Sequence, residues 1–308
     1  MAVRRTERAP RVERKQASWW ARNQKKITPY IFIAPNMIVF TVFLFVPMAI
    51  AVYMSFNEWS LIEEPTFIGF GNYVTMFRDP QFWQSLGNTL LYTAGTVPLN
   101  ICLGLLVAVG MNRALPARGL LRSIFFVPVV ISGVAVALVG SWIFNDAYGV
   151  INNGLGALGF EAVPWLTSQS WAMLSIIAMA LWLGIGFNMV VYLAALQGIP
   201  PELYEAAEID GASGWRRFRS ITWPLLGPTT FLLVILGVIQ SLHVFDLIFV
   251  MTGGGPGFAT TVLVMYVYQT AFQNLQMGYA SAMGVVLFLM LLAFTAFQWW
   301  ITRQGEQE

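Results

Sequence analysis

The side chains that could perform acid–base, metal or phosphate chemistry are few in this chain. It has one histidine, His243, and one cysteine, Cys102. These are too few for a typical Cys/His metal site or an intrachain disulfide. The lysines, Lys15, Lys25 and Lys26, do not occur in the glycine pattern of a phosphate-binding loop. No nucleophile stands at a plausible spacing from a histidine base. We therefore predict a chain with no catalytic residue, no metal site and no bound cofactor.

Polar side chains instead share a face on each of two apolar segments. Three in the second segment follow i, i+3 and i+6 spacing, and two in the first lie one turn beyond a glycine. They are Gly184, Asn188 and Tyr192 in the first segment, and Gln240, Ser241, His243 and Asp246 in the second. Because polar groups are costly against lipid, we predict that these residues line a route through the chain. Hydrogen bonds between packed helices explain any one of them equally well.

The elements that position these residues belong to a membrane protein. Hydrophobic residues make up 57% of the 308 residues and charged residues only 10%, whereas an average soluble domain has roughly 25% charged residues. Uncharged stretches of more than 20 residues recur, and about 20 suffice for a helix to cross the hydrocarbon core. We predict six membrane-spanning helices, near residues 31–55, 88–111, 123–144, 171–196, 229–250 and 277–300.

A seventh span is the main alternative to this arrangement. The last uncharged stretch is long enough for two helices, but Gly253–Gly257 interrupts it. Residues 258–276 are rich in polar side chains, so we predict an outside loop with a shallow or re-entrant helix there. Whether this piece spans the membrane is left open by the sequence.

The basic residues indicate the orientation of the chain. Residues 1–26 hold nine of the 17 Lys and Arg residues, and the alternate loops hold almost all the others. The opposite side has Arg78 alone. Since cytoplasmic loops carry the excess of basic residues, both termini are predicted to be cytoplasmic. We interpret residues 1–26 as a basic cytoplasmic tail that contacts membrane lipid, and we expect no nucleic-acid partner.

Residues 200–228 form the most polar internal stretch of the chain, between two predicted spans. Their pattern predicts a helix, a tight turn and a second helix. Pro201 suits a first helical position, which predicts a helix over 201–209. Gly211 can adopt the left-handed conformation that stops a helix. Ser213 can cap the second helix, which we expect to end before Pro224. An ordinary interfacial amphipathic helix would have the same features.

The residues of this loop resemble the EAA loop of binding-protein-dependent ABC importer permeases. The pattern runs Glu205, Ala206, Ala207, Asp210 and Gly211, followed by Phe218, Ile221, Pro224 and Pro228, and Trp223 stands where the family usually has Leu. Other segments agree: Phe125 to Pro128, Phe245–Asp246, Thr252 to Pro256 and Gly278 to Ala282. The resemblance is to the carbohydrate branch of the family, with its maltose-type and glycerol-3-phosphate-type permeases.

The resemblance implies an all-α membrane protein of the type I ABC importer permease (MetI-like) fold, with residues 27–308 as the permease domain. It implies a multi-pass protein of a bacterial or archaeal cytoplasmic membrane. The implied partners are a second six-helix permease, two ATPase subunits that bind ATP and Mg, and an extracytoplasmic substrate-binding protein. The coupling residues that it implies are Glu205, Ala206, Ala207, Asp210, Gly211, Trp215 and Phe218.

Two substrate classes are compatible with the sequence, a neutral sugar and a glycerol-3-phosphate-type substrate. A phosphate ester would favour Arg or Lys along the route, and none lies within a predicted span, so a neutral sugar is favoured. A glycerol-3-phosphate-type substrate is the alternative, since amides, helix ends or the second permease could hold an anion. A proton-coupled secondary transporter, with His243 and Asp246 as the relay, is a further alternative. The sequence does not identify the sugar, the binding protein or the division of contacts between the two permeases.

Overall fold

The computed structural model describes residues 19–60, 62–112 and 116–305, and it divides the chain into two compact units, 1–50 and 51–308. Most of the basic tail, with Arg113, lies outside the described residues. In the first unit, α1 (Trp19–Phe40) is followed by a π-helical turn, η1 (Thr41–Phe45), and by the start of α2 (Val46–Met54). Residues 28–54 are long and apolar enough to cross a membrane, and none of their most apolar window is buried.

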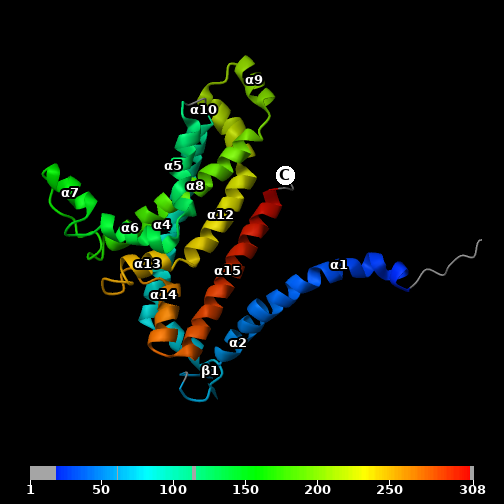
Figure 1. Ribbon diagram of the computed structural model, residues 1–308, viewed down its shortest axis with the longest axis vertical. Helices are drawn as coiled ribbons and strands as arrows, with labels where there is room; N and C mark the ends of the chain where they lie inside the picture. The colour runs from blue at the N-terminus through cyan, green and yellow to red at the C-terminus, as the bar shows by residue number, and fades with distance from the viewer. Residues whose placement is uncertain (1–18, 61, 113–115, 306–308) are drawn as a thin grey trace, which may run out of the picture. The chain divides into compact units, whose positions relative to one another are not determined.

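The second unit is helical apart from one small hairpin (Figure 1). The hairpin pairs β1 (Asn57–Glu58) with β2 (Thr66–Phe67) in antiparallel register. The long helices are α4 (Pro80–Met111), α8 (Ala172–Gln197), α12 (Gly227–Leu242) and α15 (Met277–Gly305). The shorter elements are α3 (Gly71–Arg78), α5 (Arg118–Val130), α6 (Gly133–Ile143), α7 (Val150–Ala157), α9 (Pro201–Ile209), α10 (Gly214–Arg217), η2 (Phe218–Thr222), α11 (Trp223–Leu225), α13 (Asp246–Met251), α14 (Leu263–Tyr268) and η3 (Gln269–Gln273).

Four helical stretches of the described chain are individually able to cross a membrane, and two bent helix pairs would raise the number to six. The bent pairs are α5 with α6, which turn by 102°, and residues 214–225 with α12, which turn by 62°. The predicted helices near 171–196 and 277–300 are confirmed within a few residues. The predicted start of a helix at 88 is wrong, because the Asp79 carboxylate accepts from the Gln81 N–H and starts α4 at Pro80.

Two predicted helices are interrupted in the structure. The helix expected over 123–144 breaks at Ile131 and Ser132, between α5 and α6, and Pro128 lies within the last turn of α5. The helix expected over 229–250 ends at Leu242 and restarts at Asp246. Non-helical backbone is tolerated at membrane depth where it lines a cavity, which is where both breaks lie. A seventh span is not formed at 258–276, because α14 has six residues and η3 has five.

The core of the second unit forms where α4 packs against α8, with α12 packed against both of them and α5 packed against α8. Gly104 of α4 makes the closest approach between the two long helices. A Cβ atom on Gly104 would fall against the Asn188 Cβ atom and lie 3.2 Å from the Asn188 backbone carbon. The absence of a side chain at Gly104 therefore sets the distance between α4 and α8.

We expect Gly104→Ala to destabilise the protein by about 1–3 kcal/mol, because the added methyl group overpacks a backbone contact. Gly110→Ala is the matched control: Gly110 lies on the same helix, and a Cβ atom there meets nothing within 4 Å. The midpoint temperature of unfolding in detergent measures both variants. Equal midpoints for the two would contradict a close contact at Gly104.

Asp79 joins three elements at the hairpin end of the second unit. Its carboxylate accepts hydrogen bonds from the Tyr266 hydroxyl of α14 at 2.6 Å and from the Tyr279 hydroxyl of α15 at 2.7 Å. Burial acts to raise the pKa of Asp79, but the bonds from Tyr266, Tyr279 and the backbone N–H groups of Gln81 and Phe82 outweigh it and hold the pKa below its usual value of 3.8. The ionised carboxylate thus stabilises the folded state.

A pH dependence follows from the lowered pKa of Asp79. The stability that the carboxylate contributes is fully present above the unfolded pKa and is lost as pH falls through the lower folded pKa. We expect Asp79→Asn to lower the midpoint temperature of unfolding at pH 7, and this difference from the wild type to shrink as pH falls below 3.8. A difference that stays constant from pH 7 to pH 3 would rule out the charged form as its source.

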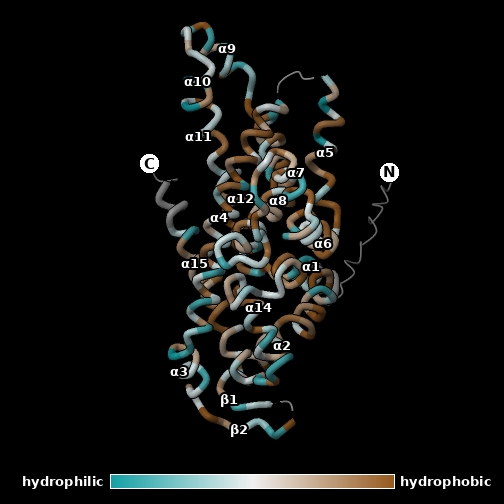
Figure 2. The backbone as a smooth tube through the Cα atoms, turned by 90° about the vertical axis from the view of Figure 1, so that its left-hand side faces the viewer, coloured by the Kyte–Doolittle hydropathy of each residue, from teal (hydrophilic) through white to brown (hydrophobic). Residues whose placement is uncertain are grey.

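Polar segments mark the two ends of the second unit (Figure 2). The hairpin β1–β2 lies at one end, and α9 and α10 lie at the other, with the apolar helices between them (Figures 1 and 2). The N-terminal end of α5 lies at the same end as α9 and α10. The loop that carries the EAA pattern is thus separated from the hairpin by the length of the apolar helices.

Candidate functional site

A cavity of about 490 Å³ lies among α4, α8 and α12, at the two helix breaks. Ligand pockets commonly have volumes of roughly 300–1,000 Å³, so a small carbohydrate has a suitable size. Its walls combine apolar and aromatic side chains with a few amides and hydroxyls. The polar lining residues are Tyr92, Thr96, Asn100, Asn188, Gln240, Ser241, His243 and Asp246.

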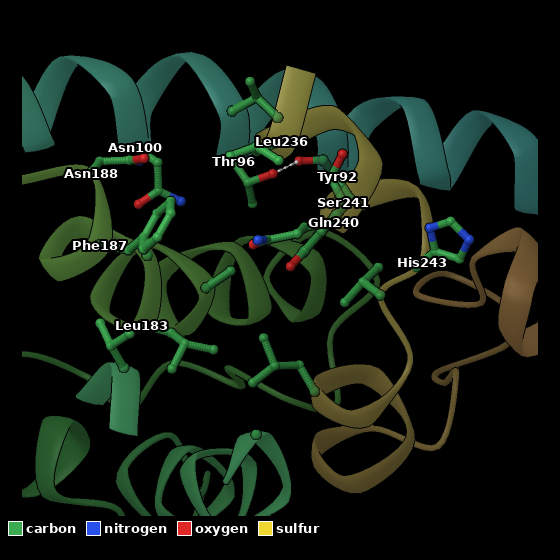
Figure 3. Close-up of a pocket in the computed structure, with 18 of the residues that line it drawn as sticks. Tyr92, Thr96, Asn100, Leu183, Phe187, Asn188, Leu236, Gln240, Ser241 and His243 are labelled. Carbon is green, nitrogen blue, oxygen red and sulfur yellow. Dashed lines mark hydrogen bonds between the residues drawn. The ribbon is translucent and has the colours of Figure 1, made fainter. Parts of the chain in front are cut away.

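The structure brings six of the seven predicted route residues to this cavity. Gly184 and Asn188 line it from α8, and Gln240, Ser241, His243 and Asp246 line it from α12 and the following break. Figure 3 shows the side chain of Gln240 in the middle of the site, with Asn100 and Asn188 at one end and His243 at the other. Residues from two helices that are distant in the sequence thus face one cavity.

Tyr192, the seventh predicted residue, does not line the cavity. Its side chain is fully buried in the core between α4, α8 and α12. The hydroxyl donates to Thr230 Oγ1 at 3.0 Å, which joins α8 to α12. In this structure Tyr192 is a helix-packing residue.

Asn100 of α4 is a cavity residue that the sequence reasoning missed. Its Oδ1 atom is buried and has no hydrogen-bond partner among the described residues. A Cβ atom on Gly184 would lie 2.7 Å from both polar atoms of the Asn100 amide, so the glycine leaves the space that this amide occupies. An unpaired buried acceptor is costly, and a ligand hydroxyl is a suitable donor for it.

The two helix breaks meet at Asp246. The Asp246 Oδ2 atom lies 3.2 Å from the position that a Cβ atom on Gly133 would take. Gly133 begins α6 and Asp246 begins α13, and these two short helices pack against each other. His243 Nδ1 lies 2.8 Å from the carbonyl oxygen of Ile239, which fixes the ring at the end of α12. The break therefore presents one carboxylate and one imidazole to the cavity.

The loop with the EAA pattern folds as a helix, a turn and a helix. The predicted helix 201–209 is confirmed as α9, and Gly211 has a φ of +73°. The Ala212 N–H donates to the Ala207 carbonyl at 2.8 Å and the Gly211 N–H to the Glu208 carbonyl at 3.0 Å. This bond pair is a Schellman motif, which requires the left-handed residue. A bulky residue at Gly211 would be strained although the space around it is open.

The second helix of this loop is longer than expected. Ser213 caps α10 by accepting from the Arg216 N–H, as predicted. The expectation that Pro224 ends the helix is wrong, because the π-turn η2 leads directly into α11. In the π-turn the Trp223 N–H bonds back five residues to the Phe218 carbonyl. Pro224 falls at the start of α11, where its missing N–H is tolerated.

Two side-chain contacts hold the helices of this loop together. Arg217 Nη1 donates to Glu208 Oε2 at 2.8 Å, and the hydroxyls of Tyr204 and Thr222 lie 3.0 Å apart. The Glu208 side chain is 73% exposed and that of Arg217 30%, so water screens the ion pair and it adds little stability by itself. Together with the Schellman turn, these contacts make 201–225 a braced unit.

The braced unit presents a mixed acidic and aromatic surface. Glu205, Ala206, Asp210 and Gly211 are exposed, and Trp215 is 71% exposed. Trp215 stacks on Phe218 with ring centroids 5.6 Å apart, whereas Phe218 itself is half-buried against the core. Ala207 is also half-buried. Of the predicted coupling residues, the structure thus leaves five open to a partner and places Ala207 and Phe218 at the base.

Among the described residues, no group of three or more His, Cys, Asp or Glu side chains could hold a metal ion. Cys102 is an exposed free thiol. The cavity lining supplies amides, hydroxyls and an aromatic face, which can bind a ligand reversibly.

Comparison with known proteins gives one family. Residues 100–304 match the family described as "Binding-protein-dependent transport system inner membrane component". The sulfoquinovosyl glycerol transport system permease protein SmoG of Agrobacterium fabrum is 38% identical over 93% of this chain and 94% of its own. The sn-glycerol-3-phosphate transport system permease protein UgpA of the same organism is 35% identical over 89% of this chain and 94% of its own.

A solved structure with the same fold is a bacterial alginate ABC transporter in complex with an alginate pentasaccharide-bound periplasmic protein. The matching chain superposes with a TM-score of 0.81 at 29% identity. The match covers 93% of this chain and 97% of that one. The family match over residues 100–304 includes α8, α12 and the loop 201–225.

Proposed function

This chain belongs to the family of binding-protein-dependent transport system inner membrane components, and we propose that it passes an uncharged carbohydrate through the cavity among α4, α8 and α12. It is a permease component of an ABC importer, a multi-pass membrane protein and not an enzyme. Membership of an ABC importer family also goes against the proton-coupled alternative.

The composition of the cavity lining carries the proposed substrate class. No Lys or Arg is among the lining residues of the described cavity, and its only carboxylate is Asp246. An anionic substrate would meet no Lys or Arg side chain there, whereas sugar hydroxyls can exchange hydrogen bonds with Asn100, Asn188 and Gln240. Phe187 adds an aromatic face, and apolar walls with a few placed polar groups are typical of small-molecule sites.

A glycerol-3-phosphate-type substrate is the second candidate. It is favoured by the similarity to UgpA, which is nearly as great as the similarity to SmoG. Sulfoquinovosyl glycerol carries a sulfonate and glycerol-3-phosphate a phosphate, so both relatives are named for anionic substrates, and the similarity to them does not support the neutral class. The lining of the cavity is the more direct observation, and it favours the neutral substrate.

The proposed assembly follows the family. The solved alginate transporter was captured with its periplasmic protein, and this chain belongs to a family that works with a substrate-binding protein. We further infer a second six-helix permease and two ATPase subunits, with ATP and Mg bound by the ATPases. Glu205, Asp210, Gly211 and Trp215 would form the contact with an ATPase, since they are exposed on the braced unit.

The proposed membrane arrangement has six spans and cytoplasmic termini. It counts α5 with α6 as one span and takes α12 as the membrane part of the other bent pair, and it places α9 and α10 in the cytoplasm. The support is the distribution of basic residues, with residues 1–26 as the cytoplasmic tail. The arrangement places the protein in the cytoplasmic membrane of a bacterium or archaeon.

Substrate-stimulated ATP hydrolysis by the purified transporter tests the proposed function. The chain is tagged and purified in mild detergent with the subunits that accompany it, then reconstituted with its binding protein. Neutral oligosaccharides and glycerol-3-phosphate are supplied in parallel. We expect an ATPase and a second permease to co-purify, and stimulation by a neutral sugar only.

Two results would contradict this proposal in different ways. Stimulation by glycerol-3-phosphate alone would overturn the substrate class but keep the importer. Transport by the purified chain without any ATPase subunit would overturn the coupling mechanism itself.

A further inference from the structure

Two arginines near the start of α5 have no counter-charge in the described structure. Arg118 and Arg122 stand four residues apart, so their side chains share a helix face. The Nε atom of Arg118 and the Nε and Nη2 atoms of Arg122 are buried without a hydrogen-bond partner among the described residues. Buried guanidinium nitrogens without an acceptor are costly, because their desolvation is not compensated.

The local backbone adds to the positive potential. Arg118 is the first residue of α5, whose first turn carries no acidic residue and no side-chain cap. The amino end of a helix dipole is positive, so the dipole repels the two arginine side chains and destabilises them there. The only salt bridge within the described residues joins Glu208 and Arg217, on another element. An anion beside Arg118 and Arg122 would compensate both the dipole and the two side chains.

An apolar hollow continues along α5 from these arginines. It has a volume of about 440 Å³ and is lined by Ser123, Phe126, Val127, Val130 and Ile131. Phe126 follows Arg122 by one helical turn, so the hollow adjoins the position of the charges. Val127 and Val130 are exposed, and Phe126 lies between them and Arg122 around the helix, so α5 offers a charged end and an apolar trough on adjoining faces.

This combination fits an amphiphile with an anionic head. Guanidinium groups bind phosphate oxygens through paired hydrogen bonds, and both arginines remain partly exposed, so the charges can be reached. The arginine end of α5 lies at the same end of the unit as α9 and α10, which the proposed function places in the cytoplasm (Figures 1 and 2). Basic pockets between helices on that side of a membrane bind anionic lipid headgroups.

We propose that Arg118 and Arg122 bind the phosphate of an anionic phospholipid of the cytoplasmic leaflet, whose acyl chain lies in the hollow beside Val127 and Val130. The site depends on the proposed function only for its sidedness. It is separate from the substrate cavity, although Ile131 reaches both. A carboxylate from a partner protein would satisfy the arginines but would not explain the adjoining apolar hollow.

Lipid retention by the purified transporter tests this site. The chain, with the subunits that accompany it, is delipidated in detergent and titrated with phosphatidylglycerol, phosphatidylcholine or inorganic phosphate. Native mass spectrometry counts retained lipid, and thermal unfolding reports stabilisation. For the wild type we expect retention and a higher midpoint temperature with phosphatidylglycerol only.

Three variants complete the design. Arg118→Gln with Arg122→Gln is expected to weaken phosphatidylglycerol retention by about tenfold or more, the effect of losing a charge-assisted bond. Arg118→Lys with Arg122→Lys keeps the charge and should retain more lipid than the glutamine pair. Arg78→Gln is the matched control, since Arg78 is an exposed arginine at the hairpin end, and it should behave as the wild type. If the double glutamine variant fails to insert, Arg122→Gln alone takes its place.

The outcomes separate this proposal from its alternatives. Unchanged phosphatidylglycerol retention in the glutamine variants would overturn it, and so would equal retention of phosphatidylcholine. Stabilisation by inorganic phosphate to the same extent would show a free-anion site instead of a lipid site. Loss of the accompanying ATPase from every preparation, with lipid retention intact, would count against the proposed function and not against the lipid site.

Discussion

A Gly211→Val variant is expected to insert and assemble normally but to lose substrate-stimulated ATP hydrolysis. Gly211 has a φ of +73°, and its N–H and that of Ala212 close the turn between α9 and α10. A left-handed conformation costs an L-residue about 1–2 kcal/mol, and a β-branched residue is still less suited to it. The turn would reopen, and α9 would no longer be fixed to α10. A backbone strain of about 1.4 kcal/mol corresponds to a factor of ten in rate, so we expect stimulated hydrolysis to fall by about tenfold or more.

Matched controls separate backbone strain from the addition of bulk. Gly214 is three residues away, also exposed, with open space around it and no positive φ. Gly214→Val should therefore retain stimulation, and Gly211→Asn should retain part of it, because Asn tolerates the left-handed region. The measurement is ATPase activity with and without loaded binding protein. Full stimulation in Gly211→Val would contradict the role of this turn in coupling.

This loop could be predicted in detail because local rules determine it. Pro201 at the start of a helix, Gly211 at its stop and Ser213 at the next cap each act through backbone geometry within a few residues. The failure at Pro224 is also local. A π-turn directly before it lets the helix continue, and nothing in the residue types of 218–222 distinguishes a π-turn from an α-turn.

The helix breaks in the membrane region could not be predicted in the same way. Apolar periodicity looks continuous through Ile131 and through His243 because hydropathy reports burial in lipid or protein and not backbone conformation. The breaks are stable because other helices surround them, and that packing involves residues distant in sequence. Asp246 beside Gly133 is an example: neither residue indicates the other.

The same reason explains the two errors in the predicted route. Tyr192 has the polar character and spacing of a route residue, but Thr230 of α12 supplies its hydrogen bond in the core. Asn100 shares a polar face of α4 with Tyr92 and Thr96 at four-residue spacing, a signal that the prediction did not use, and the packing of α4 against Gly184 brings this face to the cavity. Helix spacing predicts which residues share a face, and tertiary packing decides what that face contacts.

The second large effect is expected at Gln240. Its side chain projects into the middle of the cavity between α4, α8 and α12 (Figure 3). We expect Gln240→Leu to reduce uptake of a neutral sugar by about 10- to 100-fold, because a lost hydrogen bond that leaves a polar group unpaired costs about 1–3 kcal/mol. ATP hydrolysis without substrate should persist, since the loop 201–225 is unchanged. Uptake into proteoliposomes and basal ATPase activity measure the two effects on one preparation.

Gln84→Leu is the matched control, because Gln84 is an exposed glutamine on the same bundle, near the start of α4 and outside the cavity. It should leave uptake unchanged. Asn100→Leu should resemble Gln240→Leu if the unpaired Asn100 Oδ1 atom accepts from the same sugar. If both cavity variants transport normally, the polar groups of this space serve helix packing, and the substrate must pass along surfaces supplied by the second permease. If both lose basal ATPase activity as well, the variants have disturbed assembly, and the effect on uptake cannot then be assigned to sugar contact.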